Sequence, residues 1–183
     1  MPGSCNLLDD WFGEILGRYG PFRSAWDIGS GTGKRGAQLR AANPECFVRG
    51  SDPGYNGNLA APAHYTSTDG SSIDRLIATR HFEQEPIGII VFGDVLEHLP
   101  LSGAVSAVHW AAYNARYIAA IWPTGYVQGP CGPCGAAEVH VSQPSPWELS
   151  SMGTIMVLEY RRIDANIDRQ ICTYHGLLLK GLR

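Results

Sequence analysis

The sequence predicts an α/β protein with a mostly parallel β-sheet that is covered by helices on both faces. Strand-like and helix-like segments alternate as far as residue 122, a pattern that favours right-handed βαβ units. The segment 87–92 is a continuous apolar run, which is typical of a strand buried on both faces of a parallel sheet. Two further β-like runs close the chain and predict an antiparallel hairpin at one edge.

The individual elements follow from hydrophobic periodicity and from the turn residues between them. Four helices are expected from apolar residues at helical spacing, at about 5–19, 32–42, 72–81 and 101–115. Seven strands are expected from short apolar or β-branched runs, at 23–28, 46–51, 64–67, 87–92, 116–122, 154–160 and about 168–180. A polar connection over 161–167 is expected to join the last two strands.

The size and the composition limit the classes of protein that fit. Domains usually hold ~100–200 residues, so 183 residues predict a single domain over 1–183. The formal net charge of −3 disfavours a general electrostatic grip on nucleic acid. No apolar run approaches the ~20 residues that span a bilayer, so we expect no membrane partner.

The N-terminus and the cysteines indicate a cytoplasmic location. Asp9, Asp10 and Glu14 interrupt the first apolar segment, which therefore does not resemble a signal peptide. The five cysteines are an odd number, scattered through the chain, which favours reduced thiols.

A glycine-rich turn follows the first expected strand, and two nucleotide-binding motifs can be compared with it. A phosphate-binding P-loop fails, because Ile28 stands where its first glycine should be and Arg35 where its Ser or Thr should be. A dinucleotide fingerprint is matched by Gly31, Gly33 and Gly36. An NAD-dependent oxidoreductase would also need a second nucleotide-binding half, for which the chain leaves little room.

A third interpretation rests on the D-x-G-x-G-x-G pattern of Asp27, Gly29, Gly31 and Gly33. This pattern resembles the first motif of the class I methyltransferases, which use S-adenosyl-L-methionine. The resemblance covers about residues 23–160. It implies a Rossmann-like three-layer sandwich with a seven-stranded, mostly parallel sheet and an antiparallel C-terminal strand. It also divides the domain into an N-terminal helix (1–22), a cofactor-binding core (23–122), a Gly/Pro-rich substrate loop (123–146) and C-terminal strands (147–183).

The resemblance assigns cofactor contacts to the residues that follow the strands. It implies that Asp27 meets the ammonium of the cofactor directly or through water, that Asp52 holds the ribose hydroxyls, and that Asp69 reaches the adenine amino group. A carboxylate can accept the hydrogen bonds that these groups offer. The full set of expected cofactor residues is Asp27, Gly29, Ser30, Gly31, Thr32, Gly33, Asp52, Pro53, Asp69, Gly70, Asp94, Val95 and Leu96.

A second motif, Asp94-Val95-Leu96-Glu97-His98-Leu99, follows the buried strand and resembles the D-x-L-E-H segment of small-molecule methyltransferases. It places polar groups at the carboxyl end of a strand, where α/β proteins bind ligands. His98 and His140 are candidate general bases, although a lone histidine is more often structural. We expect Glu97, Trp122 and Tyr126 at the acceptor, with Trp122 equally suited to the core.

No metal is expected. Cys131 and Cys134 form a Cys-x-x-Cys pair that could join His140 in a zinc site, but a structural zinc needs four ligands and no second pair exists.

The sequence therefore predicts an S-adenosylmethionine-dependent methyltransferase that acts on an oxygen or nitrogen of a small molecule. One alternative is an RNA (cap-type) methyltransferase domain, which would be marked by a basic surface of Arg18, Arg23, Arg35 and Arg40. Another is a non-catalytic cofactor-binding subunit. A partner subunit or a second copy of the chain could also be needed to complete the site.

Overall fold

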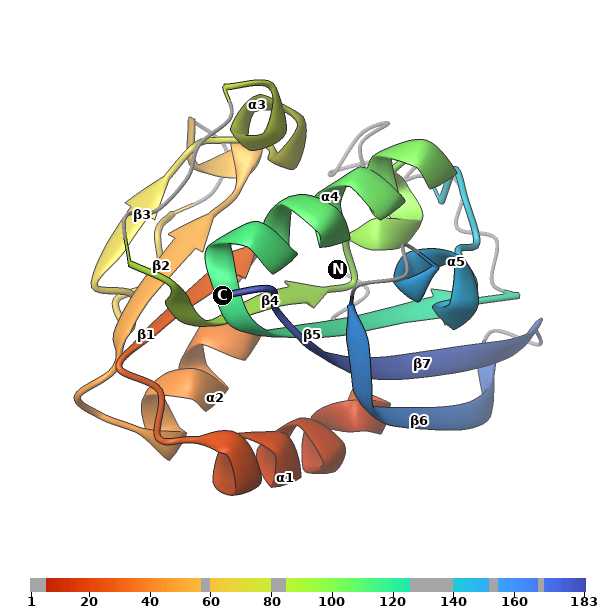
Figure 1. Cartoon of the computed structure of the whole chain (residues 1–183), viewed down its shortest axis with the longest axis horizontal. Coiled ribbons are helices and arrows are strands. Elements are labelled where there is room, and N and C mark those ends of the chain that lie inside the picture. The colour runs from red at the N-terminus through yellow and green to blue at the C-terminus, as the bar shows by residue number, and fades with distance from the viewer. Residues whose placement is uncertain (1–5, 57–59, 80–84, 126–139, 152–154, 168–169) are drawn as a thin grey trace.

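The protein folds into a three-layer α/β sandwich, as the sequence predicts (Figure 1). The computed structural model describes residues 6–56, 60–79, 85–125, 140–151, 155–167 and 170–183. The central sheet has seven strands in the order β3-β2-β1-β4-β5-β7-β6. No helix in this described part combines the length and apolar character needed to cross a bilayer.

Five strands pair in parallel and two antiparallel strands complete the sheet. The parallel strands are β1 (Ser24–Ile28), β2 (Phe47–Ser51), β3 (Ser67–Asp69), β4 (Ile87–Gly93) and β5 (Ala115–Thr124). The antiparallel strands are β7 (Gln170–Lys180), which pairs with β5, and β6 (Met156–Ile167), which forms the edge beside β7. The carboxyl ends of all five parallel strands consequently lie at one edge of the sheet, where ligands bind in this architecture.

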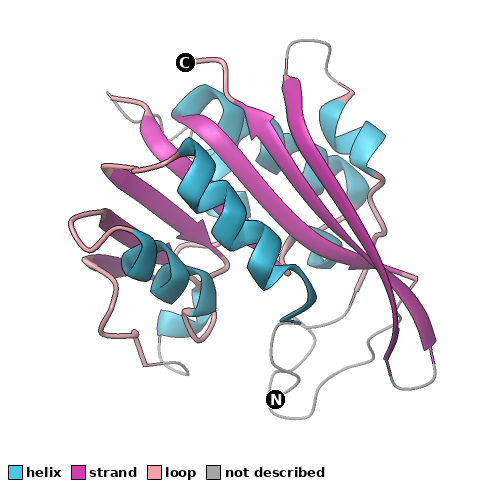
Figure 2. Cartoon of the chain, turned by 90° about the horizontal axis from the view of Figure 1, so that it is seen from below, coloured by secondary structure: helices cyan, strands magenta, loops and turns pink. Residues whose placement is uncertain are grey.

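Helices cover both faces of the sheet (Figures 1 and 2). One face carries α1 (Asp9–Tyr19), which the short 3-10 turn η1 (Asn6–Leu8) precedes, and α2 (Lys34–Ala42). The other face carries α3 (Ile73–Ala78), α4 (Leu101–Asn114) and α5 (Pro146–Ser150). Two further 3-10 turns, η2 (Pro53–Asn56) and η3 (Leu96–His98), follow β2 and β4.

Each face of the sheet has its own hydrophobic core. Phe12 and Ile15 of α1 pack with Ile89 and Val91 of β4 in one cluster. The cluster on the other face contains Ile90 and Phe92, the alternate residues of β4, together with the alanine-rich face of α4. Removing this apolar surface from water is the main stabilising contribution to the fold.

The third strand begins three residues later than predicted. It was expected at 64–67, but the chain turns there, with a hydrogen bond from Tyr65 N to Pro62 O, and pairs with β2 only from Ser67. The Tyr65 ring is buried and lies against Gly36 and Gly50, where a Cβ atom would stand 2.2 Å and 2.9 Å from it. The Tyr65 side chain therefore belongs to the interior between α2 and β2, and the residue is not part of a strand.

The C-terminal part differs from the prediction in two respects. The polar segment 161–167, expected as a connection, continues β6, because an edge strand can leave Arg161, Arg162 and Asp164 in water. Helix α5 was not expected in a region assigned to strands. The predicted substrate loop is described only at 123–125 and 140–146, so Tyr126, Cys131 and Cys134 lie outside the described residues.

Candidate functional site

The glycine turn between β1 and α2 is built from backbone conformations that favour glycine. Gly29 and Gly31 have φ angles of 66° and 48°, a left-handed region that is costly for residues with a Cβ. A Cβ on Gly29 would lie 2.3 Å from Val95 Cγ2, whereas a Cβ on Gly31 would meet nothing within 4 Å. Gly31 therefore offers an open stretch of backbone that a ligand can approach.

Asp52 ties this turn to the end of β2. Its Oδ2 accepts a hydrogen bond from Gly31 N at 2.8 Å, and its Oδ1 accepts one from Gly54 N at 2.7 Å. The carboxylate is only half-buried, and each oxygen can accept a second hydrogen bond. The structure thus brings together the two residues that the motif analysis assigned to neighbouring parts of one ligand.

Asp27 fixes the turn from inside the protein. The side chain is 1% exposed, and its Oδ2 accepts hydrogen bonds from Gly36 N at 3.0 Å and from the Tyr65 hydroxyl at 2.6 Å. Burial raises the pKa of this carboxyl to about 6, against the stabilising effect of those two hydrogen bonds. Its position is that of a supporting residue, and contact with a ligand's ammonium stays a prediction.

Tyr55 is a site residue that the sequence analysis missed. Its hydroxyl lies 2.8 Å from Ser30 Oγ and donates to Gly31 O at 3.1 Å. The turn-rich stretch after β2 was the available signal, but it did not distinguish Tyr55 from its neighbours. Two expected cofactor residues, Thr32 and Pro53, are exposed beside this group.

Asp69 is engaged by protein groups at the end of β3. Its Oδ2 accepts hydrogen bonds from Arg49 Nε and Ser51 Oγ, each at 2.9 Å, and its Oδ1 accepts one from Ser71 N at 2.8 Å. Partial burial opposes ionisation, but the hydrogen bonds from Ser71 and Arg49 hold the pKa of Asp69 below its ordinary value. The adjacent Gly70 accepts a hydrogen bond from Asn56 Nδ2 at its carbonyl.

Arg35, one of the four members of the predicted basic surface, lies inside the protein. Its side chain is buried, and Nη1 donates to Asp9 Oδ1 at 2.6 Å and to Gln38 Oε1 at 2.8 Å. Two other members have partners of their own: Arg18 pairs with Glu159, and Arg40 bonds to the carbonyl oxygens of His64 and Pro44.

Arg35 instead presents part of its guanidinium group to the end of β4. Its Nε lies 3.3 Å from the position that a Cβ on Gly93 would take. Within the described residues, Nε and Nη2 are buried and have no hydrogen-bond partner. A buried guanidinium with open donors is suited to an anionic ligand group.

The second motif turns sharply out of β4. Asp94 has a φ angle of 56°, and its N–H donates to Ile121 O at 2.8 Å. Val95 packs against Gly29. Leu96, an expected cofactor residue, is 0% exposed and belongs to the core under α4. The Leu96 side chain therefore packs in the core beside η3, and contact between this residue and a cofactor stays a prediction.

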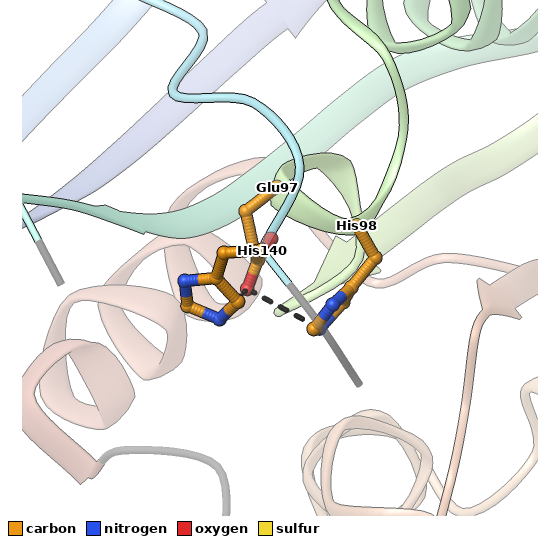
Figure 3. Close-up of side chains that lie close together, drawn as sticks. All are labelled: Glu97, His98 and His140. Atoms are coloured by element: carbon orange, nitrogen blue, oxygen red, sulfur yellow. Dashed lines mark ion pairs between the residues drawn. The ribbon is translucent and has the colours of Figure 1, made fainter. Parts of the chain in front are cut away.

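Glu97, His98 and His140 converge just beyond this turn (Figure 3). Glu97 Oε1 lies 3.9 Å from His98 Nε2 and 4.0 Å from His140 Nε2. The Glu97 side chain is 1% exposed, and the imidazole rings meet edge to face with 5.0 Å between their centroids. The segment that carries His140 is held in place because Glu97 O accepts hydrogen bonds from Val141 N at 2.9 Å and Ser142 N at 3.2 Å. Three predicted site residues thus form one cluster.

Trp122 lies in the core, one of the two positions that the sequence analysis considered for it. It is 0% exposed, stacks on His175 with ring centroids 5.2 Å apart, and donates from Nε1 to Pro144 O at 2.8 Å. This hydrogen bond ties Trp122 to the segment 140–146, and contact between Trp122 and an acceptor stays a prediction.

Comparison with known proteins establishes the fold. No known sequence family and no curated protein sequence matches the chain. Among solved structures, the 1,6-didemethyltoxoflavin-N1-methyltransferase of Burkholderia thailandensis, with bound 1,6-didemethyltoxoflavin and S-adenosylhomocysteine, superposes with a TM-score of 0.64. It is 10% identical, and the alignment covers 96% of this chain and 78% of that one. The chain has the class I methyltransferase fold.

Two further structures with this fold show how broadly it is used. TehB from Haemophilus influenzae gives a TM-score of 0.62 at 16% identity, over 94% of this chain and 62% of that one. An enzyme described as catalysing a pericyclic reaction gives 0.60 at 13% identity, over 93% and 46%. The class I fold therefore does not decide the reaction, which has to be argued from the site.

Proposed function

We propose that this protein is a methyltransferase that uses S-adenosyl-L-methionine to methylate an oxygen or nitrogen atom of a small molecule. The observation that carries the proposal is the open glycine turn at Gly31, bonded to the carboxylate of Asp52. This arrangement supplies backbone for one part of a ligand and a half-buried hydrogen-bond acceptor for another.

The residues at this edge of the sheet match the functional groups of the cofactor. Asp52 retains acceptor capacity for the two ribose hydroxyls. The open donors of Arg35 suit the carboxylate of the methionine part. The exposed backbone at Gly31 allows close approach between them. One structure with this fold was solved with S-adenosylhomocysteine bound, which supports the same ligand here.

The transfer itself requires mainly that two substrates be held in line. A lone pair of the acceptor attacks the methyl carbon, the carbon–sulfur bond breaks with its electron pair returning to sulfur, and S-adenosylhomocysteine leaves. Positioning can supply several kcal/mol of the rate gain. If the acceptor carries a proton, His98 and His140 are the proposed bases, and their position beside Glu97 supports a shared role.

Two alternatives lose support. The RNA interpretation depended on a basic surface, and Arg35 is buried while Arg18 and Arg40 have other partners. The dinucleotide interpretation conflicts with the sheet, because the usual dinucleotide-binding order ends in strands 4-5-6, whereas here the antiparallel β7 lies between β5 and β6.

Calorimetric titration with S-adenosylmethionine, S-adenosylhomocysteine and NAD tests the cofactor. We expect micromolar binding of both adenosyl ligands, at least tenfold weaker binding in Asp52→Asn and Arg35→Met, and unchanged binding in Asp74→Asn, an exposed acidic residue on α3. Binding of NAD alone would overturn the proposal. Binding of the adenosyl ligands without methyl transfer to any acceptor in a screen would favour the non-catalytic subunit.

A further inference from the structure

We infer that Glu97, His98 and His140 form a binding site for a divalent transition-metal ion, which the sequence analysis did not expect. These residues place one carboxylate oxygen and two imidazole nitrogens within 4.8 Å of one another. Two imidazoles and one carboxylate are a frequent ligand set for such ions.

The distances are close to those of a loaded site. Bonds of 2.0–2.2 Å to a zinc-like ion place neighbouring ligand atoms about 3.3–3.6 Å apart in a tetrahedral site. The measured separations from Glu97 Oε1 are 3.9 Å to His98 Nε2 and 4.0 Å to His140 Nε2. Each histidine nitrogen would need to come less than about 1 Å nearer to Glu97 Oε1, which side-chain rotation can supply.

Hydrogen bonds hold the two ligand-bearing segments together. Val141 N and Ser142 N both donate to Glu97 O, and Ser142 Oγ donates to Leu99 O at 2.6 Å. His140 is thereby fixed beside η3, although it is distant from Glu97 in the sequence. A site that is ordered beforehand loses less conformational entropy when it binds a ligand.

Burial of Glu97 favours a cation at this position. Its side chain is 1% exposed, and those of His98 and His140 are 19% and 6% exposed. A carboxylate removed from water is stabilised by pairing or by metal coordination. Imidazole binds metals in its neutral form, and a divalent ion held by the two histidines would pair favourably with the buried carboxylate of Glu97.

The ligand types select the class of metal. Imidazole suits Zn²⁺, Co²⁺, Fe²⁺ and Ni²⁺, whereas Mg²⁺ and Ca²⁺ prefer oxygen ligands. Three protein ligands leave coordination positions for water or for a substrate atom.

The acceptor class follows from this site and rests on the proposed function. With His98 and His140 holding the ion, neither acts as the base, and a hydroxyl bound to the ion would lose its proton to solvent more readily. Its oxygen lone pair would form the new bond to the methyl carbon, while the carbon–sulfur electron pair returns to sulfur. The metal site therefore favours a hydroxyl-bearing acceptor.

Titration of metal-free protein with Co²⁺ tests the inference. The Cys131→Ser/Cys134→Ser variant is used throughout, so that this cysteine pair cannot bind the ion. We expect one Co²⁺ per chain at micromolar concentration, with visible absorption of nitrogen- and oxygen-coordinated cobalt. Binding should weaken at least tenfold in Glu97→Gln and His140→Ala and stay unchanged in His109→Gln, a histidine on α4.

The outcomes separate this inference from the proposed function. Melting curves of the metal-free variants establish that they are folded, and Glu97→Gln keeps the shape of the side chain. The proposed metal site would be overturned if the Cys131→Ser/Cys134→Ser protein does not bind Co²⁺. It would also be overturned if adding Glu97→Gln to this protein leaves Co²⁺ binding unchanged. Titration of S-adenosylhomocysteine in the presence of a chelator reports on the cofactor site alone, so either proposal can fail while the other stands.

Discussion

Asp27 shows that a motif residue can be recognised from sequence while its position relative to solvent cannot. The spacing to the glycines identified it, but the buried side chain bonded to Tyr65 depends on how α2 packs on β1. The same limit applies to Leu96 and Trp122, which were expected at a ligand and are core residues. Exposure is decided by residues distant in sequence, and a local motif carries no information about them.

The raised pKa of Asp27 predicts an unusual pH dependence. The folded value is about 6 against an ordinary 3.8, so the native state binds more protons between these values. The stability contributed by this carboxyl is therefore present at low pH and is lost as pH rises through about 6. Replacing it by Asn removes this loss. The unfolding free energy of Asp27→Asn relative to wild type should rise by about 2 kcal/mol between pH 4.5 and 7.5.

Denaturant titrations of both proteins at the two pH values measure this difference. Other groups with shifted pKa values, such as His175, whose pKa is lowered chiefly by burial, are common to both proteins and cancel. A difference that stays constant with pH would contradict the assignment of Asp27.

At the scale of elements, the long and apolar segments were predictable and the short ones were not. The buried strand β4 and helix α4 have strong patterns and appear close to their expected bounds. Helix α5 was missed, although Ser145 and Glu148 have the spacing of a capping box. The helix begins where the predicted Gly/Pro-rich loop ends and lies within the segment that was assigned to the C-terminal strands.

The capping box predicts that α5 depends on Ser145. Ser145 Oγ accepts a hydrogen bond from Glu148 N at 3.2 Å, and Glu148 Oε2 accepts one from Ser145 N at 2.8 Å. Ser145→Ala should lower the unfolding free energy by about 1 kcal/mol. Ser145→Asp should restore most of the loss, because its carboxylate can cap the same N–H. Chemical denaturation measures both, and equal stability of Ser145→Ala and wild type would show that the cap contributes nothing.

At the scale of the whole molecule, the alternation of elements predicted the layers, while the strand order needed the structure. The sequence indicated an antiparallel pair at one edge, but not that β7 lies between β5 and β6. Periodicity identifies which faces are buried and leaves open which neighbour a strand pairs with. The proximity of His140 to Glu97 could not be predicted from local patterns either, because α4 and β5 lie between these two residues in the chain.

Ligand binding should stabilise the entire fold. A ligand at 100 times its dissociation constant adds about 2.7 kcal/mol to the unfolding free energy. For a chain of this size that corresponds to a rise in melting temperature of about 5–10 °C. We expect this rise with S-adenosylhomocysteine, none with NAD, and a much smaller one in Asp52→Asn at the same ligand concentration. Differential scanning calorimetry measures it, and an equal rise in wild type and Asp52→Asn would show that the ligand binds elsewhere.

The position of β7 has a consequence for how the protein is made. Strand β5 carries fully buried residues such as Ile118 and Ile121, and its outer edge pairs with β7 along its length. A ribosome makes β6 before β7, yet β6 reaches the sheet only through β7. The nascent chain must therefore hold an open, apolar strand edge until residue 180 has left the exit tunnel, a period in which unpaired edges invite aggregation. Stalled nascent chains should remain sensitive to protease until that point and become resistant just after it.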